Sequence, residues 1–309
     1  MPNNMQQKLA KPQWLKIKLT VDGEFSNIKT TLKKHKLHTV CESAHCPNIS
    51  ECWNTGTATF MLMGDVCTRG CKFCAVKTGN PMQKLDADEP KKLAKALFEI
   101  KLFDYVVLTS VNRDDLSDGG ASHFAECIKE IKNAYPEIIV EVLIPDFNGK
   151  IEDLKRIIDA KPEVIAHNIE TVERLQRKVR DARANYRQSL GVLENVKKLN
   201  PKIYTKSSIM LGLGEADEEV IQSMKDLRAI NVDILTIGQY LRPTDWHLAV
   251  SQYVPPEKFE YFKQKALELG FLFCASGPFV RSSYKAGEMF VKNVIKGKLP
   301  FKTINLNIT

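Results

Sequence analysis

Six of the eight cysteines in this 309-residue chain lie between positions 41 and 74. They form two groups, C-x4-C-x5-C over 41–52 and C-x3-C-x2-C over 67–74. Thiolates bind zinc and iron–sulfur clusters, and disulfides are rare in cytosolic proteins, so this crowding indicates metal or cluster ligation. The other two, Cys127 and Cys274, lie in apolar patterns, and we expect them to be small buried hydrophobic residues.

The second group places Cys67, Cys71 and Cys74 on one short segment. Three thiolates there can bind three irons of a [4Fe–4S] cube and leave the fourth iron open for another ligand. A structural zinc site usually takes four ligands, often from two C-x2-C pairs, and only the pair Cys71 and Cys74 is present. The spacing therefore favours a cluster, with zinc as the alternative.

The first group, Cys41, Cys46 and Cys52, also supplies three thiolates and lacks an obvious fourth ligand nearby. His45 precedes Cys46 directly, and adjacent residues seldom both reach one metal from a short loop. We therefore expect His45 to hydrogen-bond or to face solvent. The fourth ligand of this group is expected to come from a distant part of the chain.

The elements that must position these cysteines alternate regularly along the chain. Nearly continuous apolar and β-branched runs lie at 57–63, 105–111, 138–144, 164–169, 204–211 and 234–241. Amphipathic segments lie at 90–100, 124–134, 151–160, 189–199, 218–230 and 257–269. Such runs are typical of parallel strands covered on both faces, and the alternation predicts right-handed strand–helix–strand crossovers.

The predicted fold class is therefore α/β, a partial (β/α)6 TIM-like barrel with N- and C-terminal extensions. The barrel is expected over 57–270, the first cysteine group in the extension 1–56, and a second extension over 271–309. No dinucleotide-binding or phosphate-loop glycine motif is present. Ligands of parallel sheets bind beyond the carboxyl ends of the strands, and the first strand leads directly to Cys67. The second cysteine group is thus predicted at the mouth of the barrel.

Composition sets broad limits on function. The hydrophobic fraction of 43% is ordinary for a folded enzyme, and no apolar run is long enough to cross a membrane. The first residues lack the apolar core of a secretion signal, so we expect a cytoplasmic location. The net charge of +8 is compatible with an acidic partner but selects neither nucleic acid nor protein, because the basic residues are dispersed.

The C-x3-C-x2-C spacing, with Phe73 just before its last cysteine, resembles the radical S-adenosylmethionine superfamily. In that superfamily the open iron chelates S-adenosylmethionine, and an electron from the cluster cleaves the sulfonium to give a 5′-deoxyadenosyl radical. The resemblance implies that Phe73 lies beside the adenine. Packing in the core is the alternative role for this aromatic ring.

Both cysteine groups together, with the sequence RSSY at 281–284, resemble the lipoyl synthase family, and the resemblance extends over nearly the whole chain. It includes the segments GTATFMLMGDVCTRGCKFC, HNIETVERL and SGPFVRSSY. The resemblance implies two [4Fe–4S] clusters and S-adenosylmethionine as cofactors. It assigns Cys67, Cys71 and Cys74 to the radical-generating cluster. An auxiliary cluster is assigned to Cys41, Cys46, Cys52 and Ser283, with Ser282 as the fallback for the serine.

The implied activity is that of a radical S-adenosylmethionine sulfurtransferase. It inserts two sulfur atoms, taken from the auxiliary cluster, at C6 and C8 of an octanoyl chain attached to a lysine. Asn168 and Glu170 resemble the family's contacts to S-adenosylmethionine. Their alternative is structural, as a helix cap and a first-turn acid before 171–179. Asp114 and Asp115 follow the second strand and either line the mouth or cap a turn, so we do not assign them to the site.

The implied partners are octanoylated lipoyl domains of 2-oxoacid dehydrogenase complexes and the glycine cleavage H protein. A flavodoxin or ferredoxin reductant and an iron–sulfur carrier protein are also expected, but no nucleic acid and no membrane. Two other hypotheses stay open at the level of sequence. One is a radical enzyme with a different substrate, such as tRNA, and the other is a zinc-stabilised module that binds acidic partners.

Overall fold

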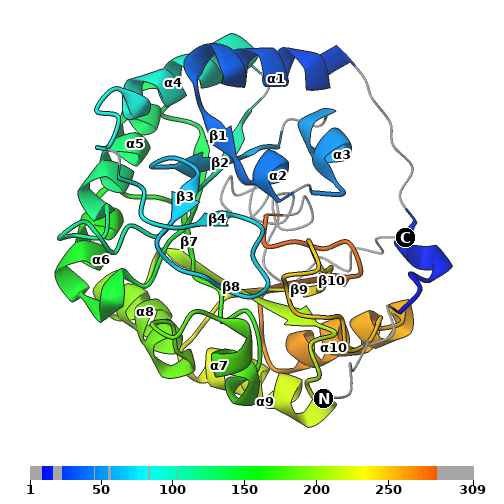
Figure 1. Cartoon of the computed structure of the whole chain (residues 1–309). Helices are drawn as coiled ribbons and strands as arrows, with labels where there is room; N and C mark the ends of the chain where they lie inside the picture. Colours follow the sequence, from blue (N-terminus) through cyan, green and yellow to red (C-terminus); the bar gives the residue numbers. More distant parts are fainter. Residues whose placement is uncertain are drawn as a thin grey trace.

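One curved β-sheet organises the chain (Figure 1). The computed structural model describes residues 9–16, 23–44, 46–54, 57–82, 84–101 and 103–283. The strand order β1-β2-β5-β6-β7-β8-β9-β10 follows the sequence, and β1 and β10 at its two ends are not paired with each other. The sheet is therefore an open barrel. Its parallel strands are β2 (Thr59–Leu62), β5 (Tyr105–Ser110), β6 (Ile139–Leu143), β7 (Val164–Ala166), β8 (Tyr204–Leu211), β9 (Ile234–Gln239) and β10 (Phe273–Gly277).

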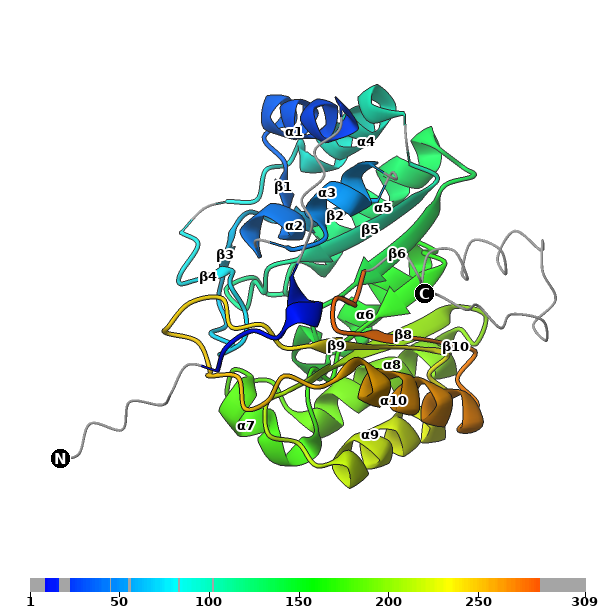
Figure 2. The same ribbon diagram turned by 90° about the vertical axis from the view of Figure 1, so that its right-hand side faces the viewer.

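The longer helices that connect these strands cover the outside of the sheet (Figures 1 and 2). They are α4 (Glu89–Ile100), α5 (Ala121–Ala134), α6 (Ile151–Asp159), α8 (Tyr186–Leu199), α9 (Asp217–Ala229) and α10 (Pro256–Glu268). Each buries one apolar stripe; in α6 the stripe is Leu154, Ile157 and Ile158. In the part of the chain that the structure describes, no helix is long and apolar enough to cross a membrane.

The six predicted strand–helix units are confirmed, with boundaries that differ by a few residues. The sheet has one parallel strand more than the six predicted, because β10 pairs with β9 along Phe273–Gly277. This strand lies in the stretch expected to be a C-terminal extension. Its sequence, FCASG, is short and rich in small residues, so its strand conformation depends on packing against β9 and α10 rather than on local propensity.

The first cysteine group belongs to an N-terminal layer beside β2. This layer contains α1 (Gly23–His35), β1 (His38–Thr39), α2 (Val40–Ser43) and α3 (Ile49–Asn54). Strand β1 pairs antiparallel with β2, and the ring of Phe25 on α1 packs 4.9 Å from that of the buried Trp53 on α3. Figure 2 shows α1, α2 and α3 together on the side of the sheet formed by β2 and β5. Cys41 on α2 and Cys52 on α3 are thereby placed near the start of the barrel.

The segment that follows β10 turns back and joins the barrel to this N-terminal layer. Asn48, between Cys46 and Cys52, donates a 2.7 Å hydrogen bond from Nδ2 to the carbonyl oxygen of Phe279. On the barrel side, a Cβ atom at Gly238 of β9 would collide with the carbonyl oxygen of Val280. Only glycine permits so close an approach of two backbones. Residues 278–283 are therefore held between the first cysteine group and the inside of β9.

Candidate active site

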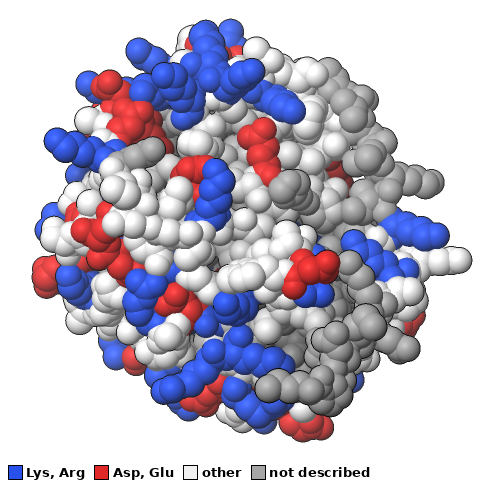
Figure 3. Space-filling view, in the orientation of Figure 1, with Lys and Arg blue, Asp and Glu red and all other residues white. Residues whose placement is uncertain are grey.

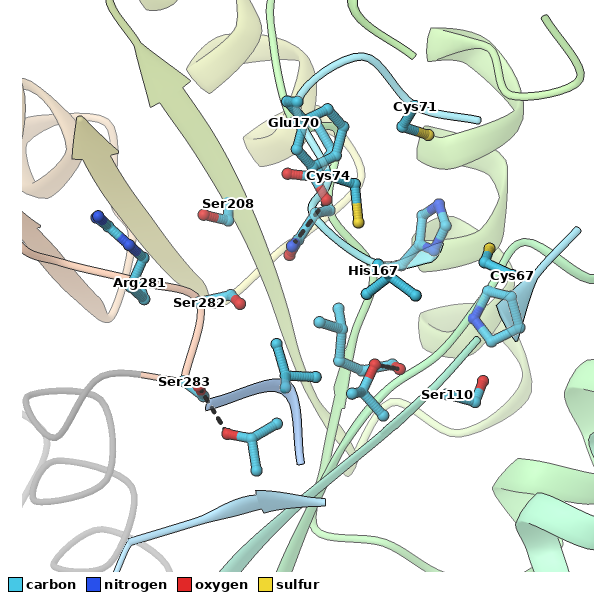
Figure 4. A pocket seen from close by; sticks show the side chains of 18 of the residues that line it. Cys67, Cys71, Cys74, Ser110, His167, Glu170, Ser208, Arg281, Ser282 and Ser283 are labelled. Carbon is cyan, nitrogen blue, oxygen red and sulfur yellow. Dashed lines mark hydrogen bonds between the residues drawn. The ribbon is translucent and has the colours of Figure 1, made fainter. Parts of the chain in front are cut away.

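A cavity of about 320 Å³ opens at the carboxyl ends of the parallel strands. Its wall includes all three cysteines of the second group, Cys67, Cys71 and Cys74 (Figure 4). Apolar side chains from β2, β6 and β8 form much of the rest: Met61, Leu143 and Met210. This is the mouth at which ligands of parallel sheets bind.

Backbone N–H groups point at the sulfur atoms of Cys67 and Cys71, on the loop that contains the second cysteine group. The N–H groups of Arg69 and Asn112 donate to Cys67 Sγ over 3.4 and 3.3 Å, and that of Asp181 donates to Cys71 Sγ over 3.3 Å. Hydrogen bonds to sulfur stabilise thiolates and tune iron–sulfur centres. Cys67 and Cys71 are thus in surroundings suited to ligation.

The guanidinium of Arg69 anchors the cysteine loop to two strand ends. It is 5% exposed and lies 2.8 Å from Asp114 Oδ1, after β5, and 2.6 Å from Asp146 Oδ2, after β6. Burial raises the pKa of both carboxyl groups, but the hydrogen bonds and charge of Arg69 outweigh it, so the pKa of Asp146 is lowered and that of Asp114 falls to about 2. Both carboxylates stay ionised, and the loop is held by a buried ionic network.

The other side of the loop is held by residues near α7 (Gln176–Val179) and by a segment after β9. Asp181 accepts a 2.8 Å hydrogen bond from the N–H of Gly70, and Arg183 donates one of 2.6 Å to the carbonyl oxygen of Thr68. His247 donates from Nε2 to the carbonyl oxygen of Cys74 over 2.8 Å. The loop therefore has anchors on four different segments of the barrel rim.

Asn168 and Glu170 lie in the wall of the same cavity, after β7. Asn168 donates from Nδ2 to Glu170 Oε1 over 3.1 Å, while its buried Oδ1 has no partner among the residues described. Burial raises the pKa of Glu170. An orphaned carbonyl oxygen beside a desolvated carboxylate is suited to a ligand that brings hydroxyl or amino donors, as S-adenosylmethionine does.

In the same wall, a fixed chain of hydrogen bonds keeps His167 neutral. His167 donates from Nδ1 to the carbonyl oxygen of Ile144 over 2.8 Å, so its Nε2 accepts from the hydroxyl of Ser189 at 3.0 Å. The Ser189 oxygen in turn accepts from Arg180 Nη1 at 2.8 Å. Burial, with the nearby Arg180 charge, lowers the pKa of His167 to about 4.

The first cysteine group lines a second, smaller cavity of about 20 Å³. Its walls contain Cys41, Cys46 and Cys52 together with Ser283. Thr59 Oγ1 donates a 2.8 Å hydrogen bond to Ser283 Oγ, which the dashed line at Ser283 in Figure 4 marks. Thr59, Arg281 and Ser283 line both cavities, so the two cysteine sites adjoin through these three residues. Ser282 lines the larger cavity but not the smaller one, which favours Ser283 as the oxygen donor.

The sulfur atoms of each cysteine group are spaced more widely than the ligands of a single zinc ion. Among the cysteines, all of which are described, neither group has its three sulfur atoms within 4.8 Å of one another. Thiolates on one tetrahedral zinc lie about 3.8 Å apart, given Zn–S bonds of ~2.3 Å. Burial raises the pKa of Cys41 to about 11 and of Cys74 to about 12, so binding of iron must displace protons from these thiols.

The structure brings every residue proposed from the sequence into these two cavities. Phe73 lines the larger one and also packs against the adjoining hydrophobic core, so both roles expected for it are compatible with its place. His45 and Tyr284 lie outside the described residues. Cys127 and Cys274 are buried, which confirms their expected packing role. Sequence reasoning missed Arg69, Asp181 and Thr59, whose partners lie far away along the chain.

The chain is similar to known proteins in sequence and in fold. The sequence model of the Radical SAM superfamily matches residues 61–227. The maturase HydG from Carboxydothermus hydrogenoformans shares the fold, with a TM-score of 0.54, 14% identity, and coverage of 89% of this chain and 78% of HydG. The chain is thus a radical S-adenosylmethionine protein, and [4Fe–4S] clusters and S-adenosylmethionine are its cofactors.

The model of the N-terminal domain of lipoyl synthase matches residues 1–46. The lipoyl synthase of Halobacterium salinarum is 59% identical over 291 residues, which cover 93% of each chain. The mitochondrial lipoyl synthase of Kluyveromyces lactis is 56% identical, covering 93% of this chain and 79% of that protein. The apicoplast lipoyl synthase of Plasmodium vivax is 55% identical over 95% of this chain, which spans only 66% of that relative's length. The chain belongs to the lipoyl synthase family.

Proposed function

We propose that this chain forms lipoyl groups by inserting sulfur at C6 and C8 of an octanoyl chain held on a lysine of a carrier domain. The main support for this function is that the cavities of the two cysteine groups adjoin. Both cavities share Thr59, Arg281 and Ser283, so a chain in the larger cavity lies between a radical source and a sulfur source.

In the larger cavity, Cys67, Cys71 and Cys74 hold the cluster that, with S-adenosylmethionine bound, supplies the 5′-deoxyadenosyl radical. Asn168 and Glu170 would bind the polar groups of S-adenosylmethionine, and Phe73 would contact its adenine. The apolar walls around Met61 and Met210 exclude water and receive the aliphatic chain. Unactivated C–H bonds do not react with side-chain acids or bases, so the site needs no catalytic acid–base pair.

In the smaller cavity, Cys41, Cys46, Cys52 and Ser283 hold the auxiliary cluster, which is the source of the inserted sulfur. An oxygen donor binds iron–sulfur centres less firmly than a thiolate does. Ser283 would therefore be the weakest of the four ligands. The hydrogen bond from Thr59 fixes the position of its oxygen.

Partners follow from the same assignment. Lipoyl domains of 2-oxoacid dehydrogenase complexes and the glycine cleavage H protein are the carriers, a flavodoxin or ferredoxin is the reductant, and an iron–sulfur carrier rebuilds the auxiliary cluster. On the face of Figure 3, Lys and Arg side chains form several separate groups with Asp and Glu side chains between them. We do not include nucleic acid among the partners. A cytoplasmic location remains a prediction, which fractionation of the native cells tests.

The test is a single-turnover assay with chain reconstituted with ³⁴S-labelled sulfide. With octanoylated carrier domain, S-adenosylmethionine and a reductant, the lipoyl product should carry ³⁴S in both positions by mass spectrometry. Unlabelled product would place the sulfur source outside the chain. The same reaction with tRNA in place of the carrier should give no sulfur-containing product, and thiolated tRNA would assign a different substrate.

A further inference from the structure

The chain leaves strand β2 through a left-handed turn that begins the second cysteine segment. Met63 has φ = 67° and Gly64 has φ = 95°. A residue with a side chain is disfavoured in this region, so the surroundings must hold Met63 there. Four residues later the chain reaches Cys67. The conformation of Met63 therefore sets the direction in which the cysteine loop leaves the barrel.

A buried carboxylate holds the backbone of this turn. The N–H of Met63 donates to both oxygens of Glu89, at 3.0 and 3.2 Å. Glu89 is the first residue of α4 and is 6% exposed. His123, in the first turns of α5, donates from Nε2 to Glu89 Oε2 over 2.6 Å. Two helices thus meet at one carboxylate that binds the turn.

The side chain of Met63 is held by the same region of α5. A Cβ atom at Gly120, which has φ = 85°, would collide with the sulfur of Met63. The carboxylate of Asp118 accepts hydrogen bonds from the N–H groups of Gly120 and Ser122, at 2.9 and 3.0 Å, and so holds the start of α5. The sequence DGGASH at 118–123 thus has two roles here. Gly120 packs against the side chain of Met63, and His123 hydrogen-bonds to the Glu89 carboxylate that binds the Met63 N–H.

A metal site is the competing interpretation, because Glu89, His123 and Cys127 have ligand atoms that all lie within 4.8 Å. Two ligands of one tetrahedral zinc with bonds of ~2.0–2.1 Å would lie about 3.4 Å apart. Glu89 Oε2 and His123 Nε2 are 2.6 Å apart, which is the length of a charge-assisted hydrogen bond. The Glu89 oxygens also already accept the Met63 N–H. The group is built for hydrogen bonding.

We propose that Glu89 and His123 are positioning residues, which hold Met63 in its left-handed conformation and thereby place the Cys67–Cys74 loop for catalysis. This inference rests on the proposed function, in which that loop binds the radical-generating cluster. Glu89 acts on the backbone directly, and His123 acts by orienting Glu89.

Hydrogen–deuterium exchange on the iron-free chain tests the positioning without any activity. Glu89→Ala and His123→Ala should each raise exchange at least about tenfold at residues 63–67, because each removes a hydrogen bond made by the Glu89 carboxylate. His123→Gln keeps an N–H donor and should restore protection to within about threefold of the parent, on the same energy scale. The matched control is Lys92→Ala. Lys92 lies farther along α4 and pairs with Asp86, and its loss should leave exchange at residues 63–67 unchanged.

Unchanged exchange at 63–67 in both alanine variants would overturn the proposal, and so would an equal rise over all of α4 and α5, which indicates loss of packing alone. A stoichiometric zinc ion on the iron-free parent that His123→Ala abolishes would also overturn it in favour of a metal site.

Iron retention separates this inference from the proposed function. With Cys41, Cys46 and Cys52 replaced by alanine, bound iron reports on the loop alone, and Glu89→Ala should lose it to a chelator faster than His123→Gln does. Equal rates of loss would contradict the inference. If replacing Cys67, Cys71 and Cys74 left the iron content of the parent unchanged, the proposed function would fail, while the exchange result would still stand.

Discussion

Thr59 donates a 2.8 Å hydrogen bond from Oγ1 to the hydroxyl oxygen of Ser283, across 224 positions of sequence. Thr59 is the first residue of β2, the strand that leads to Cys67, and Ser283 lies on the segment that closes the smaller cysteine cavity. The hydrogen bond therefore connects the wall of the first cysteine cavity to β2, the strand that leads to the second cysteine group.

Replacing Ser283 should separate radical formation from sulfur insertion. We expect Ser283→Ala to lower lipoyl formation more than about 100-fold and Thr59→Val, which removes only the outer hydrogen bond, by about tenfold, as for partners of metal ligands elsewhere. Reductive cleavage of S-adenosylmethionine should continue in both variants. Ser282→Ala is the matched control, and if it proved as damaging as Ser283→Ala, the ligand would be assigned to the wrong serine.

Loss of Arg69 should destabilise the whole barrel. Arg69→Met leaves Asp146 buried without its cation, and breaking a buried ion pair from one side costs about 3–5 kcal/mol. Urea unfolding of the iron-free chain measures this change. Lys77→Met removes the exposed pair with Asp65 from the same loop and should cost less than about 1 kcal/mol. Equal decreases in the free energy of unfolding would show that the buried Arg69 network stabilises the chain no more than an exposed ion pair does.

Glu170→Ala should weaken the binding of S-adenosylmethionine. Loss of hydrogen bonds to a charged acceptor at ~1.5–3 kcal/mol corresponds to an increase of roughly 10- to 150-fold in Kd. Equilibrium binding to the reconstituted chain gives the value. Glu173→Ala, an exposed acid three residues later that pairs with Arg187, should bind normally. An unchanged Kd in Glu170→Ala would assign this carboxylate to structure alone.

Stability should fall in mildly acidic solution because of His167. Its pKa is about 4 in the folded chain and near 6.5 when unfolded, so between these values the unfolded chain binds the extra proton. The stabilising contribution is complete above pH ~6.5 and is lost progressively as the pH falls toward 4, by up to about 3 kcal/mol. Denaturant unfolding from pH 7.5 to 4.5 checks this, and the fall should be smaller in His167→Asn. A parallel fall in both chains would exclude His167 as its cause.

The sequence could predict the parts of the protein that local pattern encodes. The six strand–helix units follow from periodicity, and the cysteine groups from spacing within at most twelve residues. Strand β10 could not be predicted, because five small and apolar residues become a strand only when β9 is beside them. Asp114 had two interpretations, rim or turn cap, since its partner Arg69 lies 45 residues earlier. Similarly, nothing in the residues around Glu89 indicates that it binds the N–H of Met63, 26 positions away.

Counting iron and acid-labile sulfide in anaerobically reconstituted chains tests whether the two cysteine groups hold two separate clusters. The parent should contain the equivalent of two cubes per chain. Replacing Cys41, Cys46 and Cys52 together, or Cys67, Cys71 and Cys74 together, should each leave one. A parent with a single cube, or one with zinc and no sulfide, would show that the two cysteine groups do not hold two separate clusters.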